Sequence, residues 1–226
     1  MGLIDISGPI YSGMWYYGEP YMDLPVGGVD IHQIDMPKKY RGSLIMDYVS
    51  MCSQTGTYLE TAAHVSVGRE TIEQIPLERV WMVPTVVIHT PTAEGAMATL
   101  DQAMRALEHD GLTIEAGDAV LIHTGWDKVW REPERFLGRP PYISRDLWFW
   151  IMDQQPSIMG ADTPRVDSPS DPQGFFARFY STDILLLAPV VNLAEVSGPW
   201  KPKLVATPLA LTGACASPVR AMLLTD

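Results

Sequence analysis

Four side chains that suit acid–base chemistry lie close together in residues 53–64, which read SQTGTYLETAAH. Histidine is the side chain whose charge ordinarily changes near neutral pH, so His64 can move protons, while Glu60 can orient its imidazole and stabilise the charged form. Tyr58 can donate a hydrogen bond to a developing oxyanion, and Gln54 can hold a substrate carbonyl or amide. The segment predicts a catalytic site that works by proton transfer. The alternative is a purely structural hydrogen bond between His64 and Glu60.

Two other places in the chain suggest contacts with a substrate. Residues 14–21, MWYYGEPY, are crowded with aromatic side chains, and such a cluster in a loop often covers a flat apolar ligand. We predict that Trp15 and Tyr17 bind the substrate, with core or interface packing as the alternative. Arg165 can clamp a carboxylate bidentately if it faces the site, the alternative being a solvated surface arginine.

The hydrophobic pattern predicts an α/β scaffold for these residues. Five apolar runs without alternation are typical of strands covered on both faces: residues 3–6, 85–88, 119–123, 157–160 and 184–187. Helices between them are indicated by Thr99 with Gln102 as a capping box, by Ser144 before an apolar stripe, and over residues 171–180. Strand–helix alternation without a linker or repeat favours one compact domain over residues 1–226, completed by strand pieces in residues 204–224.

The loop resembles the signature of the cyclase family, the metal-dependent hydrolases that include bacterial kynurenine formamidase and isatin hydrolase. That signature reads H-x-G-T-H-x-D-x-P-x-H, and Gly56, Thr57 and His64 stand at matching positions. Further segments resemble the family in the same order: LIHTGW (121–126), GADTPRVD (160–167), VNL (191–193) and SPVRA (217–221). The resemblance implies a swivelling β/β/α arrangement and assembly as a homodimer or homotetramer.

The metal ligands of the family do not carry over. In the register of the resemblance, the five ligand positions hold Gln54, Tyr58, Glu60, Phe176 and Ala188. Zinc and manganese prefer imidazole, thiolate or carboxylate, and an amide or a protonated phenol is a poor ligand. We therefore expect no cofactor and no metal ligands. The alternative is one divalent ion, zinc or manganese, held by Gln54, Glu60 and His64.

The other histidines have structural explanations. His89 and His123 end predicted strands, and His109 ends a predicted helix, so we expect each to be hydrogen-bonded or solvated. His32 lies in a polar N-terminal segment and is not assigned. Cys52 and Cys215 are expected to be small core residues, and Cys215 has no neighbouring histidine in sequence that would activate it as a nucleophile.

Composition excludes several classes of partner. The net charge of −11 argues against a nucleic-acid partner and against an anionic membrane surface. No signal-peptide pattern begins the sequence, and the apolar run of residues 184–191 is too short to span a bilayer. With only two cysteines, these features lead us to expect a cytoplasmic protein that binds a small molecule.

Three functions remain compatible with the sequence. The first is an enzyme that hydrolyses or cyclises a small cyclic or aryl carbonyl compound, such as an amide or lactone, through His64, Glu60, Tyr58 and Gln54. The second is a catalytically silent binding or partner protein on the same scaffold. The third is a metal-dependent amidohydrolase with a substituted ligand set.

Overall fold

One mixed sheet organises the chain in the computed structural model, which describes residues 2–19 and 22–225. Within those ranges the sheet has nine strands. In spatial order they are β1 (Gly2–Asp5), β13 (Met222–Thr225), β11 (Lys203–Val205), β5 (Trp81–His89), β7 (Ala119–His123), β9 (Ile158–Ala161), β10 (Leu185–Ala188), β4 (Tyr58–Glu60) and β12 (Ala216–Pro218). Strands β5, β7, β9 and β10 are parallel, and the flanking pairs are antiparallel.

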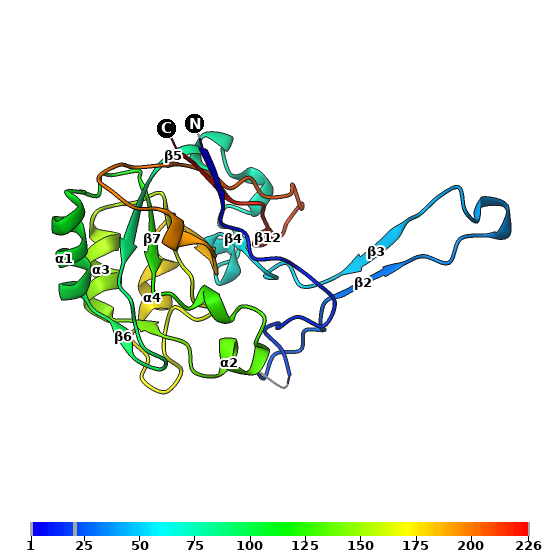
Figure 1. Cartoon of the computed structure of the whole chain (residues 1–226), viewed down its shortest axis with the longest axis horizontal. Coiled ribbons are helices and arrows are strands. Elements are labelled where there is room, and N and C mark those ends of the chain that lie inside the picture. Colours follow the sequence, from blue (N-terminus) through cyan, green and yellow to red (C-terminus); the bar gives the residue numbers. More distant parts are fainter. Residues whose placement is uncertain (1, 20–21, 226) are drawn as a thin grey trace.

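Apolar side chains on both faces hold the central strands in place. On one face, Val86 and Ile122 pack against helices α1 (Leu100–Asp110), α3 (Arg145–Asp153) and α4 (Phe175–Phe179). On the other face, Val87 and Leu121 pack with residues of the outer strands and of short 3₁₀ turns. Figure 1 shows α1 and α3 together on one side of the sheet. Because neighbouring residues of a strand point to opposite faces, a continuous apolar run fills both layers.

Smaller elements connect this framework. They are helix α2 (Pro133–Gly138), the short parallel pair β6 (Met97–Ala98) and β8 (Tyr142–Ile143), and 3₁₀ turns at Lys38–Tyr40, Ala62–His64, Ile72–Gln74, Leu77–Arg79, Asp127–Val129 and Leu193–Glu195. No helix within the described ranges is long and apolar enough to cross a membrane.

The α/β prediction is confirmed, together with its five strands and its two capped helices. All five predicted strands are present as β1, β5, β7, β9 and β10. The Thr99–Gln102 capping box begins α1, which ends at Gly111 in the left-handed conformation, and the Ser144 side chain begins α3. The two helix caps are reliable signals because each provides hydrogen-bond partners for backbone N–H groups that a helix end leaves unpaired.

The helix predicted over residues 171–180 is wrong in its first half, since α4 begins only at Phe175. The Asp167 carboxylate accepts hydrogen bonds from the backbone N–H groups of Gln173 and Phe175, at 2.7 and 3.2 Å. Gly174 has φ of +77°, which is outside helical geometry. A side chain earlier in the loop therefore satisfies the donors that a longer helix would have used.

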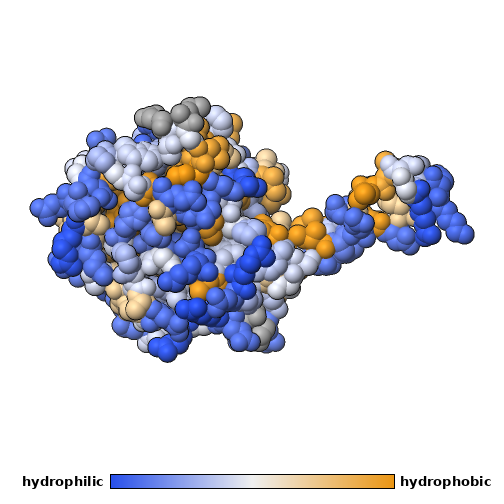
Figure 2. Space-filling model, viewed as in Figure 1, coloured by the Kyte–Doolittle hydropathy of each residue, from blue (hydrophilic) through white to orange (hydrophobic). Residues whose placement is uncertain are grey.

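A long hairpin was not predicted. Strands β2 (Asp30–Gln33) and β3 (Asp47–Ser50) pair antiparallel, and residues 30–50 form an arm that projects from the body (Figure 1). His32 lies on β2, so it belongs to a strand and not to a polar loop. Apolar side chains of the arm are exposed, among them Ile45 at 75%, and Figure 2 shows them as orange patches on its surface. No hydrophobic pattern marks this hairpin, because neither of its strands has a buried residue.

Candidate active site

A cavity of about 390 Å³ opens beside β4 and β10, and both predicted and unpredicted residues line it. Its polar lining includes Gln54, Glu60, His64, Tyr180 and Arg165. Its walls are mainly aromatic and aliphatic and include Tyr17, Met22, Leu24, Tyr58, Pro164, Val166, Pro172, Phe176 and Leu186. A mostly apolar hollow with a few convergent polar groups is the usual form of a small-molecule site.

Backbone geometry in the loop before β4 sets the position of Tyr58 and Glu60. Gly56 has φ of +65°, and a Cβ atom there would lie 2.7 Å from Ile10 Cγ1, so no larger residue fits without a shift. The Thr57 hydroxyl donates to the Pro189 carbonyl at 2.7 Å and accepts from the Gly8 N–H at 2.9 Å. The Gly-Thr pair thus fixes the start of β4 against the end of β10.

A tight turn brings His64 back to Glu60. The Thr61 hydroxyl accepts a hydrogen bond from the Ala63 N–H at 3.2 Å and begins the 3₁₀ turn Ala62–His64. His64 Nδ1 then lies 3.8 Å from Glu60 Oε2 and 3.3 Å from Gln54 Nε2. The side chain of His64 is 38% exposed, so the ring also meets solvent and the cavity.

Glu60 is the buried centre of this arrangement, with 1% of its surface exposed. The Tyr180 hydroxyl donates to its Oε1, and Gln54 Nε2 donates to its Oε2. A carboxylate can remain in such a place because both oxygens are hydrogen-bonded and a titratable imidazole lies beside it. We call Gln54, Glu60, His64 and Tyr180 the cavity cluster.

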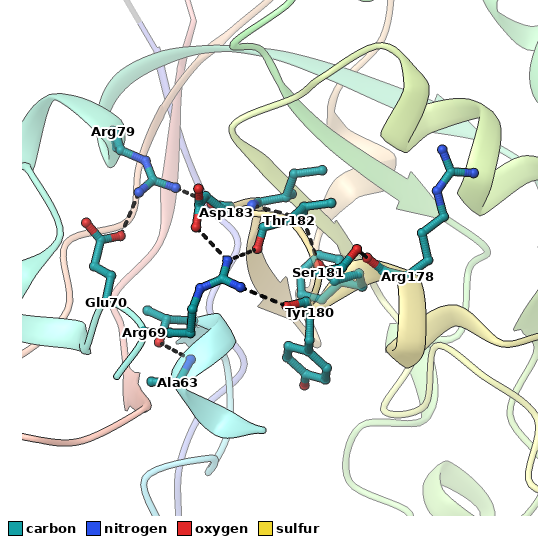
Figure 3. A network of polar contacts seen from close by, with 12 residues as sticks. Ala63, Arg69, Glu70, Arg79, Arg178, Tyr180, Ser181, Thr182 and Asp183 are labelled. Atoms are coloured by element: carbon teal, nitrogen blue, oxygen red, sulfur yellow. Dashed lines mark hydrogen bonds and ion pairs between the residues drawn. The ribbon is translucent and has the colours of Figure 1, made fainter. Parts of the chain in front are cut away.

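Sequence reasoning missed Tyr180, although a signal was present. Tyr180 follows Phe176 by one helical turn and stacks on its ring with centroids 5.7 Å apart. Residues four apart share one face of a helix, so the resemblance that placed Phe176 at the site also points to Tyr180. Arg69 holds the backbone here by donating to the carbonyls of Tyr180 and Thr182, at 3.4 and 2.7 Å (Figure 3).

Two further tyrosines form part of the wall. The Tyr17 hydroxyl donates to the Pro164 carbonyl at 2.9 Å, and the rings of Tyr17 and Tyr58 meet edge-on with centroids 6.3 Å apart. Burial raises the pKa of Tyr58 well above its usual value, and burial likewise raises the pKa values of Tyr17 and Tyr180. All three hydroxyls therefore stay protonated near neutral pH and act as hydrogen-bond donors.

Trp15 does not contact the cavity, which corrects the prediction that it binds the substrate. Its side chain is fully buried, at 0% exposure, and packs against Trp130 and Phe136 with ring centroids 4.9 and 4.8 Å away. Trp15 lies 5.7 Å from the Tyr17 ring and so supports a wall residue from behind. Pro20 and Tyr21, from the same aromatic segment, lie outside the described residues.

The two cysteines also differ from expectation, because both are partly exposed. Cys215 Sγ lies 3.7 Å from His64 Nδ1, and Cys52 Sγ lies 3.9 Å from Gln54 Oε1. The sequence around Cys215 does not predict this contact, because the thiol and the imidazole come from residues 151 positions apart.

A second titratable group lies at the ends of the parallel strands, and we call His89, His123, Asp127 and Asp162 the turn cluster. His89 Nδ1 lies 2.8 Å from His123 Nδ1, and His89 Nε2 lies 2.8 Å from the Val196 carbonyl. Asp162 accepts hydrogen bonds from Thr124, Gly125 and Trp126 of the loop that follows β7. Both histidines are hydrogen-bonded, as predicted.

The donor chemistry of the turn cluster does not favour an ion. Within the described ranges, His123, Asp127 and Asp162 form the one group of three metal-capable side chains whose ligand atoms lie within 4.8 Å of one another. Both Asp162 oxygens already accept hydrogen bonds from backbone N–H groups at 2.7 to 3.1 Å, and Asp127 accepts one from Asn192 at 2.8 Å. An ion would have to displace those donors.

The family's ligand positions do meet at the cavity, but their side chains do not suit a metal pair. Gln54, Tyr58, Glu60, Phe176 and Ala188 all line it, which supports the register used for them. Phe176 and Ala188 have no donor atom, and the raised pKa of Tyr58, caused by burial, keeps its phenol protonated. Both Glu60 oxygens accept hydrogen bonds, and the amide nitrogen of Gln54 faces Glu60 and His64.

Comparisons with known proteins agree with this fold. Kynurenine formamidase of Bacillus cereus (strain ATCC 10987 / NRS 248) is 24% identical over 225 residues, covering 97% of this chain and 96% of the relative. Isatin hydrolase A from Ralstonia solanacearum superimposes with a TM-score of 0.86 at 20% identity, covering 100% of this chain and 92% of the other. A potential metal-dependent hydrolase with cyclase activity gives a TM-score of 0.73 at 21% identity, covering 98% and 96%.

The family assignment comes from sequence. The family model described as "Putative cyclase" matches residues 4–168, a range that includes the loop, Tyr17 and Arg165. The chain therefore belongs to the cyclase family.

Proposed function

We propose that this protein is a hydrolase of small aryl or cyclic carbonyl compounds, such as amides or lactones. The observation that carries the proposal is the placement of His64 beside Glu60 at the polar end of a cavity with aromatic walls. Relatives named kynurenine formamidase and isatin hydrolase support the same class of reaction. The opposite direction, ring closure, uses the same groups in reverse.

His64 moves the protons in this reaction. The imidazole removes a proton from the group that attacks the carbonyl carbon and delivers it to the leaving nitrogen or oxygen. Between those steps the ring is an imidazolium, and Glu60 Oε2 at 3.8 Å stabilises that charge. Nδ1 is the ring nitrogen that faces Glu60 and Gln54, and it is the atom that we assign to proton transfer.

Tyr58 and Arg165 supply binding contacts in the proposal. The Tyr58 hydroxyl donates a hydrogen bond to the substrate carbonyl oxygen as negative charge develops there. Arg165 lines the same cavity and pairs with a carboxylate on the substrate. Tyr17 and Phe176 offer ring faces for a flat group. Gln54 holds Glu60 and His64 in place.

No step of this mechanism passes through a metal ion, because the donor set does not suit one. One structural neighbour is described as a potential metal-dependent hydrolase, so the absence of a metal step needs a test. The test is metal analysis of protein purified without chelator, followed by activity assays after chelation and after the metal is returned. Stoichiometric zinc or manganese, with activity lost on chelation and restored by the metal, would favour a metal-dependent amidohydrolase instead.

The direct experiment is a substrate panel with a matched variant. Wild-type protein and Glu60→Gln are assayed on N-formylkynurenine, isatin, an aryl lactone and p-nitrophenyl acetate. We expect turnover of at least one aryl carbonyl compound and a fall in kcat of about 10²-fold in Glu60→Gln, with an unchanged unfolding midpoint. Ligand binding without turnover across the panel would point to a silent binding protein.

We also propose that the chain works as a homodimer or homotetramer in which the arm contacts a partner copy. An isolated two-stranded hairpin is marginal in water, and this one exposes Leu44, Ile45, Met46, Tyr48 and Val49. Gln33 pairs with Asp47, so an Asn-Gly turn can replace residues 34–46 without changing the register. We expect light scattering to show an oligomer for the wild type and a smaller species for the shortened arm. A monomeric wild type would contradict the proposal.

A further inference from the structure

Cys215 is fixed beside the cavity cluster by the sheet itself. The residue directly precedes β12, whose Ala216 pairs with Glu60 of β4. The Cys215 carbonyl accepts hydrogen bonds from the Thr61 N–H at 2.9 Å and from the Thr61 hydroxyl at 3.3 Å. The position of the thiol therefore comes from paired strands and not from a free loop.

The thiol and the imidazole form a nucleophile–base pair by distance. Sγ lies 3.7 Å from His64 Nδ1, and the thiol is partly exposed. A thiol in contact with a histidine is a nucleophile–base pair of the kind used in covalent acyl transfer, and the Glu60 carboxylate, 3.8 Å from the same ring nitrogen, can stabilise the imidazolium. Gln54 Nε2 lies 3.3 Å from the same ring nitrogen, so the thiol, the amide and the carboxylate all face Nδ1.

The surroundings define how such a thiol would work. Burial raises the pKa of Cys215, and the negative charge of Glu60 raises it further. The resting group is therefore a thiol near neutral pH. Such a group attacks a carbonyl only when a base takes its proton during the attack. His64 is the base in contact with it.

We propose that Cys215 is the nucleophile of this site and that the reaction passes through an acyl-thioester. The inference rests on the proposed function and deepens it by naming the attacking atom. It also identifies the substrates as acyl donors with a leaving group that His64 can protonate: aryl amides, lactones and esters.

The two half-reactions balance without another reagent. In the first, the Cys215 proton moves to His64, Sγ bonds to the carbonyl carbon, and the carbon–nitrogen or carbon–oxygen bond breaks as the leaving atom takes that proton. In the second, His64 takes a proton from water, the hydroxide attacks the thioester, and the proton returns to Sγ as the acid departs. No oxidation or reduction occurs.

The test uses p-nitrophenyl acetate as the acyl donor and the second cysteine as a matched control. Wild type, Cys215→Ala, Cys52→Ala and His64→Ala are mixed with the ester, quenched in acid during turnover, and analysed by intact and peptide mass spectrometry. We expect one acetyl group on the peptide containing Cys215 in the wild type and in Cys52→Ala. Cys215→Ala and His64→Ala should carry none, and Cys215→Ala should lose at least about 10²-fold in kcat.

The outcomes separate this inference from the function on which it rests. Turnover near the wild-type rate in Cys215→Ala, with loss in His64→Ala, would overturn the thioester and leave hydrolysis by directly activated water. An acetyl group on Cys52 alone would also overturn it. Wild-type turnover in both Cys215→Ala and His64→Ala would remove the proposed function as well. Circular dichroism of each variant confirms that the compared proteins are folded.

Discussion

The cavity cluster and the turn cluster each combine imidazole with carboxylate groups, but the hydrogen-bond partners of those groups differ. In the cavity cluster, Glu60 is held by side chains, and His64 remains partly exposed at the cavity. In the turn cluster, Asp162 is held mainly by backbone N–H groups, and His89 is held by a carbonyl. Side-chain partners can reorganise around a substrate, whereas backbone partners fix the fold. Chemistry is expected in the first cluster and structural support in the second.

The largest effect should come from removing the imidazole of the cavity cluster. We expect His64→Ala to lower kcat about 10²- to 10⁴-fold, the usual contribution of a positioned acid–base group, while the free energy of unfolding stays unchanged. Steady-state kinetics and urea unfolding measure the two quantities. His123→Asn is the matched change in the turn cluster and should leave kcat near the wild-type value. If both variants lost activity equally, the distinction between the clusters would fail.

The converse result is expected for the carboxylate of the turn cluster. Asp162→Ala leaves the N–H groups of Thr124, Gly125 and Trp126 buried without their acceptor, so the free energy of unfolding should fall by about 3–5 kcal/mol. Activity per folded molecule should persist. Asp127→Asn, which weakens one hydrogen bond from Asn192, serves as the milder control. Chemical denaturation, with activity measured in parallel, tests this prediction. An unchanged unfolding midpoint in Asp162→Ala would contradict the structural role of this carboxylate.

A smaller effect should follow from the hydroxyl that sequence reasoning missed. A hydrogen bond to a charged group contributes about 1.5–3 kcal/mol, and we expect Tyr180→Phe to lose the low end of that range, about tenfold in kcat, by releasing Glu60 Oε1. Because Tyr180 positions Glu60 and does not react, the acidic limb of the pH–rate profile should shift while KM changes little. Phe176→Leu, on the same helical face, should alter KM instead. A pure KM effect in Tyr180→Phe would assign that hydroxyl to substrate binding.

The smallest effect concerns the dependence of stability on pH. The Val196 carbonyl requires a proton on His89 Nε2, so Nδ1 accepts from His123, and burial followed by the charge of His123 lowers the pKa of His89. Below about pH 6.5 the unfolded chain then binds more protons than the folded one, and stability should fall as the pH falls further. Urea midpoints between pH 7.5 and pH 5 test this, and His89→Gln should flatten the curve. His32→Asn, a change on the exposed arm, should not.

Where the residues are neighbours in the chain, their meeting at one place could be predicted from the sequence. Gln54, Glu60 and His64 come from one loop, so the family pattern and the chemistry of the side chains sufficed. Tyr180 and Cys215 are brought in by α4 and by the pairing of β12 with β4, which no local pattern encodes. Trp15 was misjudged because an aromatic run shows apolar character without showing which side chain faces inward.

The same division applies to the fold. Strands buried on both faces and capped helices have local signatures, and those predictions were confirmed. The arm has neither, since its stability depends on contacts outside its own residues, and α4 was shortened by a carboxylate from the preceding loop. Elements whose caps and buried faces come from their own residues can be predicted from sequence. Elements whose hydrogen bonds or packing depend on residues far away in the chain cannot.

The placement of β12 has a consequence for how the protein is made. Thr61 and Cys215, which are joined by hydrogen bonds, are 154 residues apart, so a ribosome has translated most of the message before the thiol can meet the imidazole. A nascent chain stalled upstream of β12 would display His64 and Glu60 without the strand that encloses them. The contact between the Cys215 thiol and the His64 imidazole can therefore form only after residue 215 has been synthesised.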